Sequence, residues 1–420
     1  MRYLFVTWDG GGNLTPELIV ARSLVGRGHE VSFLGHESQR GRIEAADCYF
    51  RGFSLAPDCD AARSDRVLVP DWEDRPPQEI FALARERFMF GPAAEFARDV
   101  LSELDRRPVD AVAIDYLILG ALAGVESCGV PGAALWHTPY LPAGVEVRPP
   151  EGGAPGAVRV DDRESQRRSM ARPSSWWNEG LTSFNAVRQG LGLGPLANVF
   201  DQYDRLARVL VLTSPSFDFA ALSGASLPDN VRYVGGQARR RPRRAPTART
   251  AQDRPLVLVS LGTTYQAQEE LLRRVVDALA PLPVRVVVTT GPAVTLEGSP
   301  PSNVEVSRWI PHHEILPDTA LVVTHGGMGT VMASLAYGVP LVCIPLGRDQ
   351  PYNAARVTYS GAGIRLSRSA GLSEITTTIR SALSDGRLEA NARRMARALE
   401  LEMLEDQAAL ELERIASHAG

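Results

Sequence analysis

The sequence lacks the features that mark exported, membrane-spanning or metal-clustering proteins. Its four cysteines, Cys48, Cys59, Cys128 and Cys343, lie far apart and include no CxxC pair, which argues against a zinc site and a disulfide framework. No apolar run approaches the ~20 residues of a membrane-spanning helix, and the N-terminus has neither the basic region nor the apolar core of a secretory signal. We therefore expect a cytoplasmic protein without a membrane partner.

A strong charge of either sign is also missing. The formal net charge is -4, which argues against a surface that binds nucleic acid through phosphate contacts. The chain is long, since its 420 residues exceed the roughly 250 to 300 that one hydrophobic core supports. Two domains are expected.

Apolar runs of strand length alternate with helical patterns in both halves of the chain. The runs are YLFVTW, EVSFLG, AVAID, GAALWH and VLVLTS in the first half, and LVLVSLG, VRVVVTT, ALVVT and PLVCIPL in the second. Near-continuous apolar strands are typical of parallel sheets that helices cover on both faces. The predicted fold class is α/β, with two doubly wound, Rossmann-like domains.

The domain boundary is expected in GGQARRRPRRAPTARTAQDRP, which has neither a helical nor a strand period. We predict a first domain at 1–234, a linker at 235–254, a second domain at 255–387 and a helical tail at 388–420. Another irregular stretch, 148–173, is long for a loop inside a domain, and such loops tend to lie near substrates.

The most specific chemical signal is ALVVTHGGMGTVMASLAYGVPLVCIPLGRDQ. Its pattern predicts a buried strand that ends at Thr324, a glycine turn, a helix over 328–337 and a second strand over 341–346. A right-handed crossover makes the two strands parallel, so both end at the same edge of the sheet. That edge gathers His325 with Asp349 and Gln350.

The residue types at this edge suit a nucleotide sugar. Glycines after a strand let backbone N–H groups approach a phosphate at the N-terminus of a helix. A carboxylate such as Asp349 and an amide such as Gln350 suit the hydroxyl groups of a sugar. A nucleotide sugar is the ligand that needs both.

The same residues resemble the donor-binding signature of the family 1, GT-B fold glycosyltransferases, particularly bacterial enzymes that glycosylate natural products. The pattern W-I-P…H-G-G-M-G-T…G-V-P…D-Q spans about forty residues in the expected order, and LVSLGTT precedes it. The resemblance implies an inverting transferase that moves a sugar, favoured to be a deoxysugar, from a nucleoside diphosphate to a secondary-metabolite aglycone. It further implies that no metal or other cofactor is needed, and that the tail returns to the first domain.

The resemblance also assigns parts to individual residues. Trp309 is expected to stack on the nucleobase, Ile310 to bind it through the backbone, and Asp349 and Gln350 to hold the sugar. The diphosphate is expected to lie against Gly262, Thr263, His325, Gly326, Gly327, Gly329 and Thr330.

One position in the signature bears on the choice of nucleotide. Relatives that use uridine donors commonly carry a Glu three residues beyond Thr330, where it binds both ribose hydroxyls, and this sequence has Ala333. Without that carboxylate nothing pairs with a 2′-hydroxyl. The resemblance therefore favours a TDP-sugar over a UDP-sugar.

The first half raises the question of the catalytic base. In relatives, the position of Asn13 in WDGGGNLTP is typically a His oriented by an Asp, for which Asp115 is the match. An Asn amide cannot usefully accept a proton. Three explanations stay open: another base at this edge, an acceptor acidic enough to need none, or an engineered change that suppresses turnover. We favour another base, either His137 or Asp115, with Asp9 as a third candidate.

Other interpretations of these motifs remain. The glycine turn has Thr15 where a dinucleotide-binding fingerprint needs its third glycine, and the DxD string at Asp58 and Asp60 lies outside the donor half. A sugar-nucleotide epimerase of the same fold, or a catalytically silent binding protein, would share the donor signature. The expected partners are a nucleotide sugar and a small aglycone, and a homodimer is left open.

Overall fold

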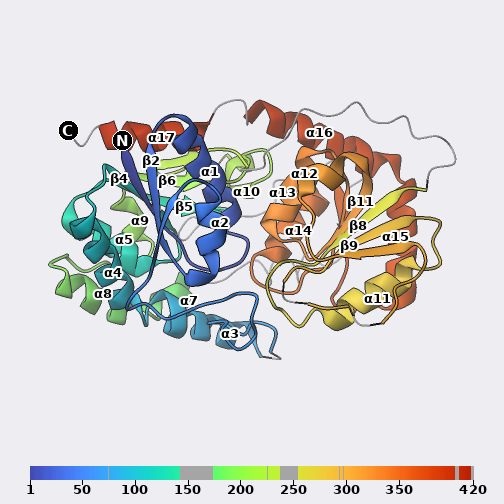
Figure 1. Ribbon diagram of the computed structural model, residues 1–420, viewed down its shortest axis with the longest axis horizontal. Helices are drawn as coiled ribbons and strands as arrows, with labels where there is room; N and C mark the ends of the chain where they lie inside the picture. The colour runs from blue at the N-terminus through green and yellow to red at the C-terminus, as the bar shows by residue number, and fades with distance from the viewer. Residues whose placement is uncertain are drawn as a thin grey trace.

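The protein folds into two lobes that lie side by side (Figure 1). The computed structural model describes residues 1–73, 75–141, 174–224, 226–236, 254–292, 294–296, 298–402 and 406–417. The predicted irregular stretch at 148–173 and the centre of the predicted linker lie outside these residues.

Each lobe is built on a parallel sheet, which confirms the predicted α/β fold. The first sheet has the order β3 (Tyr49–Gly52), β2 (Glu30–Gly35), β1 (Arg2–Val6), β4 (Ala111–Asp115), β5 (Gly132–Trp136), β6 (Arg208–Val211), β7 (Val231–Tyr233). The second has the order β10 (Val304–Ser307), β9 (Arg285–Thr289), β8 (Leu256–Ser260), β11 (Thr319–Thr324), β12 (Leu341–Cys343), β13 (Gly363–Arg365). In both sheets the strand order reverses beside the first strand, which is where doubly wound folds bind ligands.

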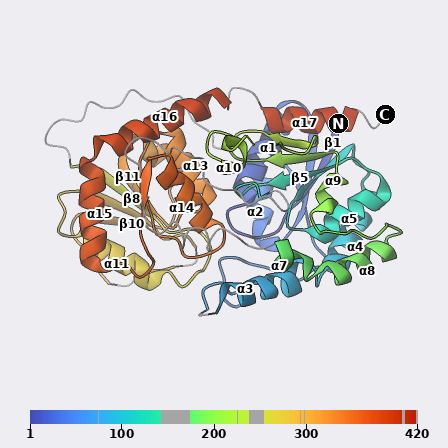
Figure 2. The same cartoon turned by 180° about the vertical axis from the view of Figure 1, so that it is seen from behind.

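Helices cover both faces of the sheets (Figures 1 and 2). Those of the first lobe are α1 (Leu14–Gly26), α2 (Arg40–Glu44), α3 (Pro77–Ala84), α4 (Ala93–Arg106), α5 (Leu119–Cys128), α7 (Ser174–Asn178), α8 (Leu181–Gly190), α9 (Asp201–Asp204) and α10 (Phe219–Leu222). The rest are α11 (Glu269–Leu279), α12 (His312–Ile315), α13 (Met328–Ala336), α14 (Gln350–Tyr359), α15 (Leu372–Ser384), α16 (Gly386–Glu402) and α17 (Gln407–Ser417).

Side-chain alternation along β1 shows how both faces are buried. Leu4 and Val6 join the core under α4 and α5, whereas Tyr3 and Phe5 join the core under α1. Successive side chains of a strand point to opposite faces, so a strand covered on both sides needs apolar residues at every position. This is why the central strands are visible in the sequence as uninterrupted apolar runs.

The tail differs from its prediction. A single helix was expected over 388–420, but the described residues form two, since α16 ends at Glu402 and α17 begins at Gln407. The two helices pack on different lobes, α16 on α13 and α17 on α1. In Figure 2 α17 lies beside the N-terminus, across the first lobe.

The strand expected over 341–346 is also shorter than predicted. It stops at Cys343, two residues before Pro345, which has no N–H to donate to a ladder.

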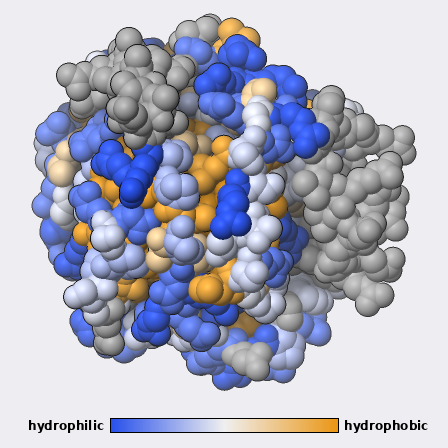
Figure 3. All heavy atoms as spheres, turned by 90° about the vertical axis from the view of Figure 1, so that its right-hand side faces the viewer, coloured by the Kyte–Doolittle hydropathy of each residue, from blue (hydrophilic) through white to orange (hydrophobic). Residues whose placement is uncertain are grey.

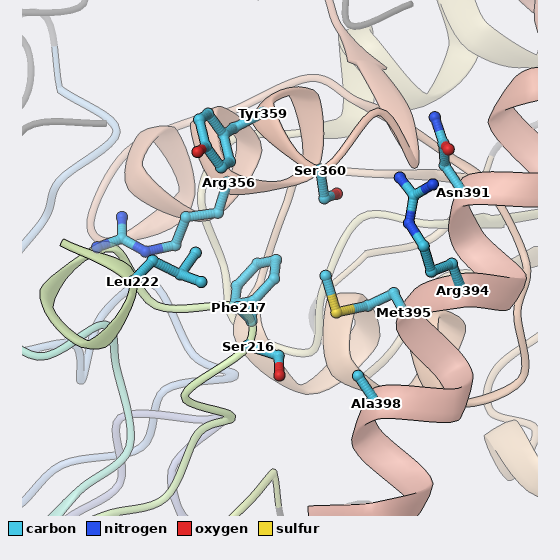
Figure 4. A pocket seen from close by; sticks show the side chains of 10 residues that line it. All are labelled: Ser216, Phe217, Leu222, Arg356, Tyr359, Ser360, Asn391, Arg394, Met395 and Ala398. Carbon is cyan, nitrogen blue, oxygen red and sulfur yellow. The ribbon is translucent and has the colours of Figure 1, made fainter. Parts of the chain in front are cut away.

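A buried ion pair joins the lobes. Arg356 of α14 donates to Asp218 at 2.8 Å, and neither side chain is exposed to solvent. Asp218 also accepts the backbone N–H of Tyr140 and the hydroxyl of Tyr233, so its charge is well satisfied. Arg356 forms one wall of a pocket of about 280 Å³ between α10, α14 and α16, which holds none of the predicted site residues (Figure 4).

The surface is mixed in polarity. On the outer end of the second lobe, hydrophobic atoms show between hydrophilic side chains (Figure 3), as on most folded proteins. Within the described residues, no helix has both the length and the apolar character to cross a membrane.

Candidate active site

The carboxyl edge of the second sheet forms a cradle around His325. The imidazole follows β11 directly and lies between two glycine backbones, one after β8 and one before α13. A Cβ on Gly327 would lie 2.5 Å from Nε2 of His325, and one on Gly262, whose φ is +104°, would lie 3.0 Å from the same atom. Only glycine fits at these two positions, so the backbone closes tightly on the ring.

His325 is neutral in this cradle. Burial lowers its pKa to about 4, against the small opposing effect of a hydrogen bond to the backbone of Ser260. The nearby guanidinium of Arg348 lowers the pKa further. The ring can therefore position a phosphate by hydrogen bonding, but it adds no positive charge near pH 7.

The N-terminus of α13 faces the same edge. Gly327 is its N-cap residue and uses no side chain to cap the helix, so the first N–H groups, those of Met328, Gly329 and Thr330, have no partner within the helix. Free N–H groups and the helix dipole together favour an anion. Gly329 and Thr263 are exposed there, whereas Gly326 and Thr330 are buried.

Trp309 stands out from the second lobe with 66% of its surface exposed, which is unusual for a large aromatic side chain. Its loop is tied to the cradle, since the carbonyl of Arg308 accepts the N–H of Gly291, and a Cβ on Gly291 would lie 2.8 Å from the carbonyl oxygen of Gly262. Ile310 packs against the apolar cluster that contains Ala333.

Asp349 and Gln350 begin α14, but their side chains differ in availability. Asp349 is partly exposed and accepts the amide of Asn353 at 2.8 Å. Gln350 is only 2% exposed; its Oε1 accepts the N–H groups of Leu346 and Gly347, and its Nε2 donates to Gln266. In this conformation Gln350 shapes the loop, and Asp349 is the more exposed member of the pair.

The two lobes meet at this cleft through a contact that the sequence did not reveal. Arg348 donates to Asp71 of the first lobe through Nε at 2.8 Å and through Nη2 at 3.2 Å. Gln266 donates to the same carboxylate at 2.9 Å. Arg348 adopts a φ of +57°, which is uncommon for a residue with a side chain.

Asn13 lies at the facing edge of the first sheet, where it is the N-cap residue of α1. Its Nδ2 does not cap the helix but donates to Asp115 Oδ2 at 2.9 Å and to the carbonyl of Trp8 at 2.9 Å. Its Oδ1 is buried without a partner among the described residues. The amide of Asn13 thus lies over Asp115 and shields its carboxylate from solvent.

The three alternative bases differ in access to the cleft. His137, at the end of β5, keeps 11% of its side chain exposed and places Nδ1 3.5 Å from Asp115 Oδ2. Asp115 is fully buried, and burial raises its pKa, although His137 and the N–H of Leu117 oppose that rise. Asp9 accepts the N–H of Gly11 and the hydroxyl of Ser38, so it holds the glycine turn.

Glu17 also belongs to this cluster and was missed in the sequence. Its carboxylate is fully buried on α1, and ligand atoms of Glu17, Asp115 and His137 lie within 4.8 Å of one another. A signal was available, because Glu17 follows Asn13 by four residues and therefore lies on the same face of the helix. By contrast, Asp58 of the DxD string pairs with Arg66 on the surface.

Comparison with known proteins identifies the family. Residues 273–411 match the family described as Erythromycin biosynthesis protein CIII-like, C-terminal domain. The chain is 30% identical over 414 residues to the 4'-demethylrebeccamycin synthase of Lentzea aerocolonigenes, a match that covers 94% of each chain. The chain belongs to the natural-product glycosyltransferases of the GT-B fold.

Other relatives agree with this assignment. The demethyllactenocin mycarosyltransferase of Streptomyces fradiae is 25% identical over 365 residues, which is 84% of this chain and 73% of the relative. The crystal structure of the calicheamicin glycosyltransferase CalG4 has the same fold, with a TM-score of 0.74 and 21% identity over 99% of this chain and 98% of that chain. Glycosyltransferases of this family act on a nucleotide sugar donor and a small aglycone.

Proposed function

We propose that this glycosyltransferase moves a sugar from a TDP-sugar to a secondary-metabolite aglycone with inversion at the anomeric carbon. The observation that carries the proposal is the cradle, in which two glycine backbones and the start of α13 enclose a neutral His325. N–H groups that are fixed in advance stabilise a departing diphosphate without reorganisation during the reaction.

The choice of TDP rests on Ala333. Its side chain is buried in an apolar cluster that Ile310 also contacts, so this wall of the predicted nucleoside site offers no carboxylate to a ribose 2′-hydroxyl. The deoxyribose of TDP has no 2′-hydroxyl, so it loses no hydrogen bond there. This contact concerns the ribose of the nucleoside and leaves the identity of the transferred sugar open to a deoxysugar.

A calorimetric comparison of TDP and UDP tests the preference. The wild type is expected to bind TDP at least as tightly as UDP. Ala333→Glu should shift the ratio of the two affinities towards UDP by roughly tenfold, the value of one charge-assisted hydrogen bond. UDP binding much more tightly than TDP in the wild type, or an unchanged ratio in the variant, would contradict the donor assignment.

For the base we propose His137, with Asp115 as the residue that orients it. Asp115 is fully buried beneath Asn13, whereas His137 lies at the end of the adjacent strand and is partly exposed. In this arrangement Nδ1–H of His137 points towards Asp115, and Nε2 accepts the proton of the acceptor hydroxyl. One displacement by that hydroxyl inverts the anomeric centre.

Incubation of the donor with and without an aglycone separates the remaining alternatives. Transfer predicts a glycosylated product that appears only with the aglycone. An epimerase would alter the sugar nucleotide alone, and a silent binding protein would bind TDP but give no product with any aglycone tested.

A further inference from the structure

Glu17 is the most unusual buried group of the first lobe. It has no exposed surface, and neither of its carboxylate oxygens has a hydrogen-bond partner among the described residues. A buried, unpaired carboxylate in its charged form costs several kcal/mol, so a side chain of this kind persists only if it is neutral or has a partner in another state.

The groups around Glu17 define its charge state. Asp115 on β4 and His137 after β5 lie in the same cluster, Thr7 follows β1, and Arg42 acts on it from α2. Burial raises the pKa of Glu17 well above its ordinary value, and the like charge of Asp115 raises it further, against smaller effects of Thr7 and Arg42. Two buried carboxylates this close do not both ionise near neutral pH.

The two acids are not equivalent. Asp115 accepts hydrogen bonds from Asn13 and from the N–H of Leu117, and both bonds favour its charged form. Glu17 has no backbone donor of this kind, and the hydroxyl of Thr7 has only a smaller effect on it. The proton of the pair therefore stays on Glu17, and the negative charge stays on Asp115 beside His137.

We propose that Glu17 is a positioning residue that carries a buried proton and so holds the Glu17–Asp115–His137 cluster in the singly negative state that the transfer needs. The proposal rests on the function proposed above, in which His137 accepts the acceptor's proton. A second negative charge at Glu17 would lie behind the reacting oxygen as that oxygen becomes more negative, and it would oppose the reaction.

The first test measures the proton without using activity. A group whose folded-state pKa is raised contributes stability below its unfolded-state pKa and loses it as pH rises. As pH rises above the ordinary carboxyl range, the unfolding constant of the wild type should therefore rise relative to that of Glu17→Gln, by at most tenfold per pH unit, because the variant has no titrating group at this position. Glu17→Leu provides the same comparison if the Gln variant folds poorly.

The second test measures the functional consequence. The wild type should lose kcat/KM on the high-pH side of its profile as Glu17 ionises, and Glu17→Gln and Glu17→Leu should both lack that loss. The chain contains no lysine, so no lysine ammonium group contributes to the alkaline limb.

The outcomes separate this proposal from the proposed function. Parallel stability curves for the wild type and Glu17→Gln would show that Glu17 is ionised and would overturn the proposal. A steep difference in stability with an unchanged alkaline limb would also overturn it, because the proton would then have no part in transfer. Failure of the proposed function looks different, since the wild type would then give no product at any pH.

Discussion

At the scale of single residues, our account places the catalytic base at His137 and not at position 13. The amide of Asn13 donates to Asp115, whereas the imidazole of His137 approaches the same carboxylate from the neighbouring strand. The function of a His and Asp pair is thus retained in our account, but with the His on a different strand.

We expect His137→Ala to lower kcat by about 10² to 10⁴-fold, the usual contribution of a general base. The binding of TDP, which involves the other lobe, should change little. Steady-state rates and TDP calorimetry on the same variant check this prediction. A variant that keeps the wild-type rate would remove His137 as the base.

The pKa of His325 leads to a prediction about stability. Because folding lowers its pKa from 6.5 to about 4, the neutral ring stabilises the fold above pH 6.5, and this contribution is lost as pH falls towards 4. The free energy of unfolding of the wild type should fall relative to that of His325→Gln by up to about 1.4 kcal/mol per pH unit in this window. Urea titrations at several pH values provide the measurement, and parallel curves would show that His325 titrates normally.

At the scale of elements, the sequence predicted the central strands and missed the edges. All nine predicted runs are strands, whereas the four strands that were missed, β3, β7, β10 and β13, are the two edges of each sheet. Edge strands are short here and partly exposed, so residues such as Glu305 in β10 interrupt the apolar pattern. A continuous apolar run indicates a strand that is buried on both faces, and an edge strand is too exposed to have such a run.

The features of the predicted site also divide into those that a local sequence motif predicts and those that it does not. The glycine turn and α13 follow from a local motif, and α13 (Met328–Ala336) lies where that motif predicts a helix. Two other contacts depend on which distant side chains the fold brings together. Arg348 and Asp71 are 277 positions apart in the sequence, and Glu17 and Asp115 are 98 positions apart. No local sequence pattern contains that information.

The helix α17 should contribute directly to the stability of the first lobe. Leu412 is fully buried against the core that contains Phe5 and Leu14, so Leu412→Ala should lower the free energy of unfolding by about 2 to 5 kcal/mol. The matched control is Leu401→Ala on α16, because Leu401 is 73% exposed and its loss should cost little. Equal effects of the two substitutions would contradict the packing described here.

At the scale of the whole molecule, two ionic contacts set how the lobes meet. Asp218 and Arg356 join them at the back, and Asp71 and Arg348 join them at the cleft. Closure at the cleft excludes water, which competes with the acceptor for the anomeric carbon.

Removing one member of the buried pair should be costly. Asp218→Ala leaves the guanidinium of Arg356 buried without its partner, for which we expect a loss of about 3 to 5 kcal/mol in the free energy of unfolding. Adding Arg356→Met should recover part of that loss, because the pair is then replaced by apolar groups. Chemical unfolding of both variants measures this, and an additive penalty in the double variant would contradict it.

The central claim is that the cradle around His325 grips the diphosphate of the donor, and TDP calorimetry with Gly327→Ala tests it most directly. The new methyl group would lie 2.5 Å from the ring, so TDP affinity should fall by roughly 5- to 100-fold, the equivalent of 1 to 3 kcal/mol of overpacking. Gly371→Ala, where an added Cβ meets no atom within 4 Å, is the matched control and should bind TDP as the wild type does. Equal TDP affinity in all three proteins would contradict the account.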